Sequence, residues 1–187
     1  MPLTKNEFRK KCQQKSKKSM DANPLYKDAS INKALIQELR AGKRKNILFY
    51  YPLQQEANIL KALYRLRKKH RIFLPFMVGK SFKMVPFRLP LQKKKFQIFE
   101  AGNSLYDRKK IDIAIVPVVG VDGNFQRVGF GKGMYDRFFE KLQERPYTIF
   151  IQRDLCCTRQ KICDSYDITA DLMITADKKI IKRKYRC

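Results

Sequence analysis

The chain has 187 residues, of which 42 are Lys or Arg and 17 are Asp or Glu, so its formal net charge is +25. A hydrophobic content of 44% is enough for one globular domain over residues 1–187, because a chain of this length can bury a core. No apolar run approaches the roughly 20 residues of a membrane span, and the basic N-terminus lacks the apolar segment of a secretory signal, which favours a cytoplasmic protein with no membrane contact.

The first elements are two helices. Thr4 and Glu7 have capping-box spacing, which predicts an N-terminal basic helix that begins at Lys5 and fills the segment up to about residue 20. Lys5 and Arg9 lie four apart on one face of this helix, and they are either solvated or hold an anion between them. A second helix is expected over 31–40, ending before a glycine.

Buried strands alternate with further helices along the rest of the chain. A helix is expected over 59–69, and a turn at 78–81 joins two strands into a hairpin. The expected strands span 46–51, 71–77, 82–89, 96–99, 111–119, 147–152 and 170–175. Residues 178–187 form either an edge strand or a basic tail. This alternation predicts an α/β fold, a single three-layer α/β/α domain with a mostly parallel central sheet.

Residues 127 to 137 read Arg-Val-Gly-Phe-Gly-Lys-Gly-Met-Tyr-Asp-Arg and combine alternating glycines with a lysine and an aspartate. The backbone amides of such a loop can approach an anion closely, because glycine has no Cβ. Lys132 adds a mobile cation suited to phosphate, and Asp136 adds the hard oxygen ligand that Mg²⁺ prefers. An apolar strand precedes the loop and a helix follows it, which is a common setting for phosphate binding. The segment predicts a nucleotide–metal site.

The loop matches no standard phosphate motif literally. A dinucleotide fingerprint needs a glycine where Met134 stands, and a Walker loop needs Ser or Thr where Gly133 follows Lys132. The alternative is a tight turn that carries a surface lysine.

The cysteines and the charge leave other interpretations open. The five cysteines are odd in number, include no Cys-x-x-Cys and accompany a single histidine, so a zinc site is not expected. We expect the cysteines to be reduced, structural thiols. A charge of +25 fits a nucleic-acid binder, but no helix-turn-helix or ribonucleoprotein motif accompanies it. We expect no specific nucleic-acid partner.

The segment 111–139 resembles the signature of the 5-formyltetrahydrofolate cyclo-ligase family, also called 5,10-methenyltetrahydrofolate synthetases. The residues that match this signature are Asp112, Val116, Pro117, Asp122, Arg127, Gly129, Gly131, Lys132, Gly133, Tyr135 and Asp136. Thinner matches extend over nearly the whole chain, at Lys5, Arg9, Glu56, Leu74, Pro75, Met84, Asp167, Asp171 and Thr175.

Several positions depart from the family pattern. They are Ile59 for Thr, Ala101 for Pro, Val121 for Phe, Phe125 for Gly, Cys156 for Gln and Tyr166 for His. None of them removes the glycine-rich loop, and they bear on the shape of the folate pocket. The same fold acting on another ATP-linked substrate is therefore an open alternative.

The resemblance implies an ATP- and Mg²⁺-dependent enzyme that closes 5-formyltetrahydrofolate into 5,10-methenyltetrahydrofolate and releases ADP and phosphate. Transfer of the γ-phosphoryl group to the formyl oxygen makes that oxygen a leaving group, and the nitrogen at position ten then attacks the formyl carbon. Such a transfer depends on positioning and charge neutralisation. The implied partners are ATP and a reduced formyl-folate, and the protein would act as a monomer. The basic surface would also favour a polyglutamate tail on the folate, because it attracts that anionic tail by electrostatic steering.

The resemblance also implies roles for individual residues. Arg127, Lys132 and Asp136 would be catalytic. ATP would contact Lys5, Arg9, Arg127, Gly129, Phe130, Gly131, Lys132, Gly133, Met134, Tyr135, Asp136 and Asp167. Asp136 and Asp167 would face the metal. Glu56 would hydrogen-bond the pterin, whose pocket would be lined by Tyr51, Met84, Met134 and Tyr135. For Tyr51 and Met84, ordinary core packing is the competing interpretation.

Overall fold

A seven-stranded sheet forms the centre of the protein in the computed structural model, which describes residues 3–21, 23–93, 99–100, 110–185 and 187. Its strands are β1 (Asn46–Leu48), β2 (Arg71–Val78), β3 (Ser81–Pro86), β6 (Ile113–Pro117), β9 (Tyr147–Ile151), β10 (Leu172–Ile174) and β11 (Lys179–Ile181). They are ordered β11-β10-β9-β6-β1-β2-β3. The five inner strands are parallel and an antiparallel strand closes each edge, which confirms the expected mostly parallel sheet.

The inner strands are apolar on both faces because both faces are covered. Ile47, Ile115 and Ile149 point into one hydrophobic cluster, whereas their neighbours Val116 and Phe150 point into the other. Strands buried in this way read as continuous β-branched runs rather than as alternating patterns. The sequence pattern of the inner strands follows directly from this burial.

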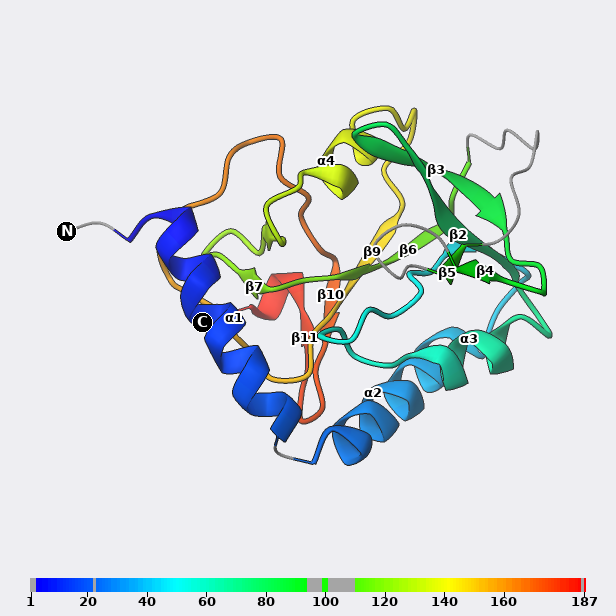
Figure 1. The fold of residues 1–187 in the computed structure, drawn as a ribbon, viewed down its shortest axis with the longest axis horizontal. Coiled ribbons are helices and arrows are strands. Elements are labelled where there is room, and N and C mark those ends of the chain that lie inside the picture. The colour runs from blue at the N-terminus through cyan, green and yellow to red at the C-terminus, as the bar shows by residue number, and fades with distance from the viewer. Residues whose placement is uncertain (1–2, 22, 94–98, 101–109, 186) are drawn as a thin grey trace.

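Two helices cover the first face, α2 (Pro24–Leu39) and α3 (Leu60–Leu66), which lie along one side of the sheet (Figure 1). Ile31, Leu35 and Leu39 recur every four residues and form the buried stripe of α2. Asn32 joins the helices, because its amide nitrogen donates to the carbonyl of Asn58 and its oxygen accepts the N–H of Ala62, both at 2.7 Å.

The second face carries the short helix α4 (Met134–Phe139) and a ribbon of two short strands, β7 (Gly120–Val121) and β8 (Arg127–Val128). Phe138 of α4 stacks on Phe82 of β3 with ring centroids 4.3 Å apart. Helices thus lie on both faces of the sheet. The glycine-rich loop does not follow the central strand directly, since the ribbon stands between them.

The turn of this ribbon contains a strained residue. Phe125 stands where the family pattern has glycine, and its φ of 63° lies in the left-handed region that glycine adopts freely. Its ring is buried, with Tyr185 at 4.4 Å between centroids. Burial of this ring offsets a backbone cost of about 1 kcal/mol or more.

The N-terminal helix α1 (Lys5–Asp21) packs across the end of the sheet, as Figure 1 shows at its left. The capping box is confirmed: the Thr4 N–H donates to Glu7 at 2.9 Å, and the Glu7 N–H donates to the Thr4 hydroxyl at 3.2 Å. A Cβ on Gly120 would lie 2.7 Å from the Phe8 ring, so α1 contacts the β7 backbone directly.

Other sequence expectations differ in extent from the structure. The second helix begins at Pro24, not Ile31, and proline at a first helical position is itself a start signal. The C-terminal segment contains the edge strand β11 and a 3₁₀ turn, Lys182–Lys184. The expected strand 96–99 lies outside the described residues except for Phe99, and Ala101 lies outside them as well. Of the described residues beside this gap, β4 (Gln92–Lys93) pairs with β5 (Phe99–Glu100). Within the described part of the chain, no helix is long and apolar enough to cross a membrane.

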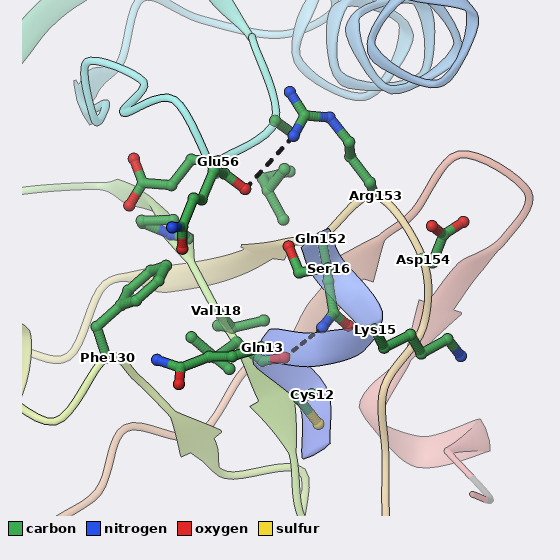
Figure 2. Close-up of a pocket in the computed structure, with 15 residues that line it drawn as sticks. Cys12, Gln13, Lys15, Ser16, Glu56, Val118, Phe130, Gln152, Arg153 and Asp154 are labelled. Atoms are coloured by element: carbon green, nitrogen blue, oxygen red, sulfur yellow. Dashed lines mark hydrogen bonds between the residues drawn. The ribbon is translucent and has the colours of Figure 1, made fainter. Parts of the chain in front are cut away.

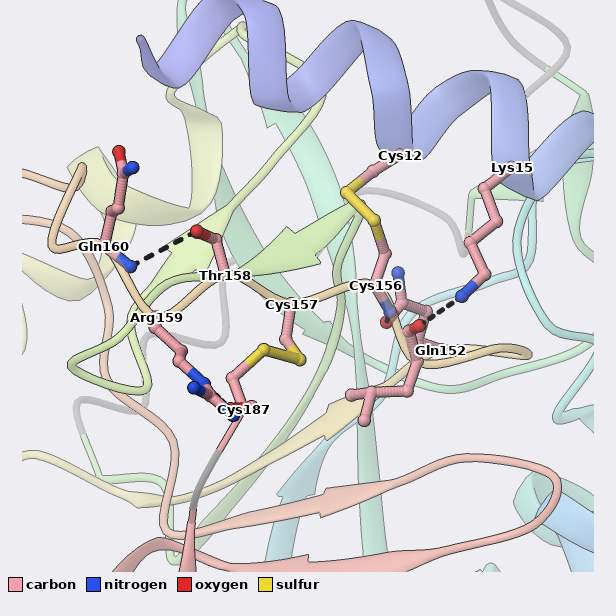
Figure 3. Close-up of a disulfide and its surroundings, with 10 residues drawn as sticks. Cys12, Lys15, Gln152, Cys156, Cys157, Thr158, Arg159, Gln160 and Cys187 are labelled. Carbon is pink, nitrogen blue, oxygen red and sulfur yellow. Dashed lines mark hydrogen bonds between the residues drawn. A yellow bond between two sulfur atoms is a disulfide. The ribbon is translucent and has the colours of Figure 1, made fainter. Parts of the chain in front are cut away.

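The expectation of reduced thiols is wrong for four of the five cysteines. Cys12 pairs with Cys156, and Cys157 pairs with Cys187, so α1 and the C-terminus are both bonded to adjacent residues of one loop (Figure 3). Cys163 is free. Sequence spacing could not reveal these pairs, because both depend on where the fold brings the two chain ends.

We expect the double variant Cys12→Ser, Cys156→Ser to lose about 2–4 kcal/mol of unfolding free energy, because the crosslink closes a long loop in the unfolded chain. Urea unfolding without reductant measures the loss. Cys163→Ser is the control and should change stability much less. Equal stability of the double variant and the wild-type protein would contradict the expectation.

Candidate active site

A cavity of about 770 Å³ opens beyond the carboxyl ends of the parallel strands. Its lining comes mainly from the segment after β1 and from the glycine-rich loop with the start of α4. The residues that line it are Tyr50, Tyr51, Pro52, Leu53, Gln54, Gln55, Glu56, Pro75, Met77, Phe82, Arg127, Phe130, Lys132, Gly133, Met134 and Tyr135. Ligands of open α/β sheets bind at this edge, so the cavity is the candidate active site.

The glycine-rich loop is held in shape by its neighbours. Gly131 and Gly133 have φ values of 96° and 58°, which other residues adopt only with strain. The Arg137 guanidinium donates to the carbonyls of Lys132 and Lys80, so the loop is joined to the β2–β3 turn. From the other side, Arg9 Nε of α1 donates to the Gly129 carbonyl at 2.8 Å.

Arg127 is a buried cation beside the loop, with only 6% of its surface exposed. Its Nε donates to the Pro117 carbonyl at 3.1 Å, and its guanidinium carbon lies 4.9 Å from the centre of the Tyr135 ring. A Cβ on Gly129 would lie 2.3 Å from Arg127 Nη1. Gly129 is therefore required for the guanidinium to pass, a role distinct from anion contact.

Asp136 lies next to this guanidinium, with its Oδ2 3.7 Å from Arg127 Nη1. Its Oδ1 is buried and has no hydrogen-bond partner. Among the described residues, no group of three or more acidic, His or Cys side chains could hold a metal alone. One carboxylate completed by phosphate oxygens and water is the usual Mg²⁺ arrangement, and Asp136 fits it.

Lys5 reaches toward two aspartates rather than into the cavity. Its ammonium pairs with Asp167 and, at 3.2 Å, with Asp164. Burial acts to lower the pKa of Lys5, but the hydrogen bond and charge of Asp167 outweigh it, and the pKa is raised. Tyr166, which replaces the family histidine, donates its hydroxyl to Asp164 at 2.9 Å. Asp164 was not anticipated from the sequence.

Glu56 lines the same cavity as Lys132. Its carboxylate accepts the Leu53 N–H at 2.9 Å. Burial raises its pKa to about 7, although that hydrogen bond and the charges of Arg127 and Arg153 act in the opposite direction. Glu56 can therefore donate or accept a proton near neutral pH.

A second, much smaller pocket of about 30 Å³ lies between α1 and the Glu56 segment (Figure 2). Glu56, Gln55 and Phe130 line both this pocket and the cavity. Arg153 closes one side and is fixed by a bidentate pair with Asp28 at 2.8 and 3.0 Å. The two hollows are adjacent, and α1 forms part of the wall of the smaller one.

The structure brings together many of the residues that the sequence singles out. Tyr51, Glu56, Arg127, Phe130, Lys132, Gly133, Met134 and Tyr135 share the cavity. Six other candidates are not among the described residues that line the cavity: Gly129, Gly131 and Asp136 of the loop segment itself, and Lys5, Arg9 and Asp167 outside it. Met84 packs in the core cluster with Phe82, not on the cavity wall.

Comparison with known proteins identifies the architecture of this site. A family model described as the 5-formyltetrahydrofolate cyclo-ligase family matches residues 3–175. The chain belongs to the 5-formyltetrahydrofolate cyclo-ligase family. A cyclo-ligase of Mycoplasma pneumoniae is 24% identical over 176 residues, covering 92% of this chain and 98% of that protein. One of Mycoplasma genitalium is 26% identical over 174 residues, with the same two coverages.

Solved structures share the cyclo-ligase fold. The 5,10-methenyltetrahydrofolate synthetase of Aquifex aeolicus superposes with a TM-score of 0.76 at 22% identity, covering 99% of this chain and 96% of that chain. The synthetase of Mycoplasma pneumoniae gives 0.71 at 23% identity, covering 92% and 98%. At these identities the likeness shows the fold.

Some residues of this cyclo-ligase family site were not found from the sequence. Gln54 and Gln55 adjoin Glu56, and their position could have signalled a cavity wall. Arg153 carries no such signal, because its approach to Glu56 depends on the pairing of distant strands. The Gln expected at position 156 is Cys, and the structure uses it to bond α1.

The raised pKa of Glu56 predicts a pH-dependent stability. Because the folded state binds the proton more tightly than the unfolded state, whose pKa is near 4.5, the stabilisation is present at low pH and is lost as pH rises to about 7. Glu56→Gln should remove this decline, which we expect to be about 1–3 kcal/mol. Urea unfolding at a series of pH values measures it. Glu140→Gln, at an exposed glutamate, is the control, and an unchanged decline in Glu56→Gln would refute the assignment.

Proposed function

We propose that the protein catalyses the ATP-dependent cyclisation of 5-formyltetrahydrofolate to 5,10-methenyltetrahydrofolate, with release of ADP and phosphate. The observation that carries this proposal is the cavity that Glu56 and the glycine-rich loop with Lys132 line together. A carboxyl group can bind the polar edge of a pterin, and a loop of amides and cations can bind a triphosphate. Membership of the cyclo-ligase family supports the same pairing.

ATP phosphates would lie along the glycine-rich loop. Lys132 lines the cavity and Arg127 is anchored beneath it, so both could neutralise charge on the transferred phosphoryl group. Arg9 would act from the other side, since it already contacts Gly129. Asp167 pairs with Lys5. We therefore propose that the main role of Asp167 is to position this lysine, and that facing the metal is a lesser role of Asp167.

Mg²⁺ would supply charge neutralisation at the phosphate oxygens. We propose that Asp136 holds it, because Asp136 Oδ1 is buried without a partner. The buried cation Arg127, whose Nη1 lies 3.7 Å from Asp136 Oδ2, offsets the negative charge of this carboxylate beside the cavity.

The folate would occupy the wall formed by the segment after β1. Glu56 would hydrogen-bond the pterin and direct the formyl oxygen toward the γ-phosphorus, which then forms a P–O bond as ADP leaves. Attack by the nitrogen at position ten on the formyl carbon closes the ring, and the formyl oxygen leaves with the phosphate. Tyr51, Met134 and Tyr135 line the space for the rings. Met84 lies behind Phe82 in the core and would support this wall rather than touch the substrate.

We further propose a monomer in the cytoplasm that accepts a polyglutamylated folate and has no sequence-specific nucleic-acid partner. The excess of 42 Lys and Arg over 17 Asp and Glu supports attraction of an anionic tail. Disulfides rarely persist in a reducing compartment, so the two cysteine pairs oppose this location. Rapid alkylation of thiols in cell extracts tests this location. Cysteines that resist alkylation because they are paired in disulfides would exclude the cytoplasm.

The first experiment is near-ultraviolet absorbance after mixing the protein with MgATP and 5-formyltetrahydrofolate, because the product absorbs at longer wavelength. We expect a rise that needs both ATP and metal. Lys132→Ala should lower kcat/KM by about 100-fold or more, since it removes a cation at the developing charge. Lys141→Ala, an exposed lysine on the surface, is the control. No rise from a folded protein that still binds ATP would indicate a different substrate for the same fold.

Asp136→Asn should raise the Mg²⁺ concentration needed for half-maximal rate, in the same assay, by about tenfold or more, because an amide is a weaker ligand than a carboxylate. The wild-type metal titration is the reference. An unchanged metal requirement would place the ion elsewhere.

Gly129→Ala tests the anchoring of Arg127. The new Cβ would fall 2.3 Å from Arg127 Nη1 and displace the guanidinium, so we expect a loss of about 10-fold or more in kcat/KM. Gly42→Ala is the control. Alanine at its φ of 83° also costs stability, but no atom lies within 4 Å of the new Cβ. Equal activities of the two variants would show that the arginine position is not critical.

A further inference from the structure

The stretch from Leu39 to Phe99 has a charge imbalance that the cyclo-ligase site does not explain. It contains 16 Lys and Arg residues but a single acidic residue, Glu56, which belongs to the cavity wall. One of these cations, Lys80, contacts the segment of the glycine-rich loop: its backbone carbonyl accepts the Arg137 Nε–H at 3.0 Å. Three of the other cations line a different cavity.

Part of this charge surrounds a separate cavity of about 320 Å³. Its charged lining consists of Arg67, Arg71 and Arg88, with His70 and Phe87 between them. Arg71 begins β2 and pairs with Asn46 at the start of β1, so this cavity is at the amino edge of the sheet. The cyclo-ligase cavity is at the opposite edge, where the parallel strands end.

The chain brings further cations to the same edge by hydrogen bonds between two loops. The Lys45 N–H donates to His70 Nδ1 at 3.1 Å, and the Arg71 N–H donates to the Lys45 carbonyl at 2.9 Å. Lys69 Nζ donates to the Arg40 carbonyl at 2.7 Å. Segments 40–45 and 67–71 therefore form one basic rim around the cavity.

The three guanidinium groups are not neutralised by acidic partners among the described residues. No ion pair there involves Arg67, Arg71 or Arg88, and all three are exposed. Several guanidinium groups gathered around one hollow repel each other, and this arrangement suits an anion that bridges them.

Aromatic rings adjoin these cations. The Arg67 guanidinium carbon lies 5.0 Å from the centre of the Phe87 ring. The Tyr64 ring meets Phe87 edge-on at 5.7 Å, and Tyr64 is 40% exposed. Cations beside an exposed aromatic ring are the combination with which proteins hold single strands, because phosphates pair with the cations and bases stack on the ring.

We propose that Arg67, Arg71 and Arg88, with the rim 40–45 and 67–71, form an amino-edge basic site that binds the phosphodiester backbone of single-stranded nucleic acid without reading its bases. One small phosphate would occupy a single guanidinium fork, whereas cations spread over two loops match a chain of phosphates. Tyr64 supplies one stacking surface. The site is independent of the cyclo-ligase cavity.

The test is fluorescence anisotropy of a labelled oligouridylate of about 20 nucleotides over a range of salt concentrations. The variant carries Arg67→Gln, Arg71→Gln and Arg88→Gln. We expect Kd to rise at least about tenfold and the slope of log K against log salt to fall by about 2, for three lost phosphate contacts. The matched control, Lys141→Gln, Lys161→Gln and Arg183→Gln, removes the same charge from exposed positions elsewhere and should change Kd by about twofold at most.

Two further measurements separate the site from diffuse attraction. Tyr64→Leu should weaken oligouridylate binding about fivefold or more without changing the salt slope, because it removes stacking and no charge. Equal losses in the triple variant and its charge-matched control would overturn the proposal. It is also overturned if the triple variant loses affinity for inorganic phosphate but keeps that for the oligonucleotide. Unfolding midpoints verify that each variant is folded.

Discussion

The site depends on one buried cation, Arg127, and on how the chain holds it. The guanidinium is anchored to the end of β6 through the Pro117 carbonyl, faces Tyr135 and Asp136 of α4, and passes over Gly129. A buried charge is costly unless it is paired and hydrogen-bonded, so these contacts must form together. Strand end, ribbon, loop and helix are therefore joined at one point, and the loop conformation follows from it.

Around this point, three separate segments contact the loop or share the cavity with it. Arg9 reaches the loop from α1, and Arg137 connects it to the β2–β3 turn. Glu56 faces it from the segment after β1, where burial raises its pKa to about 7. The catalytic proposal thus rests on four chain segments that only the parallel sheet brings to one edge.

The sequence predicts the sheet well because burial on both faces leaves a local signal, the β-branched runs such as residues 111–119. The capping box at Thr4 is likewise local, and it is correct to the residue. The glycine-rich loop also carries its own signal. What the sequence misses depends on distant segments: Asp164 beside Lys5 and the ribbon before the loop.

The departures from the family pattern have physical explanations of the same kind. Phe125 accepts a left-handed conformation because Tyr185 covers its ring. Tyr166 retains a polar contact with Asp164. Cys156 has a partner in Cys12. Phe125 and Cys156 are each matched by a neighbour that is remote in sequence, so neither position could have been interpreted alone.

The two disulfides also give the oxidised chain an unusual connectivity. Residues 12–156 form one covalent ring and residues 157–187 form a second, and the rings are joined only by the peptide bond between Cys156 and Cys157. A protease that cuts inside either ring leaves all of residues 12–187 in one covalent piece. Between Cys12 and the C-terminus, cleavage of that single peptide bond is the only cut that divides the chain in two.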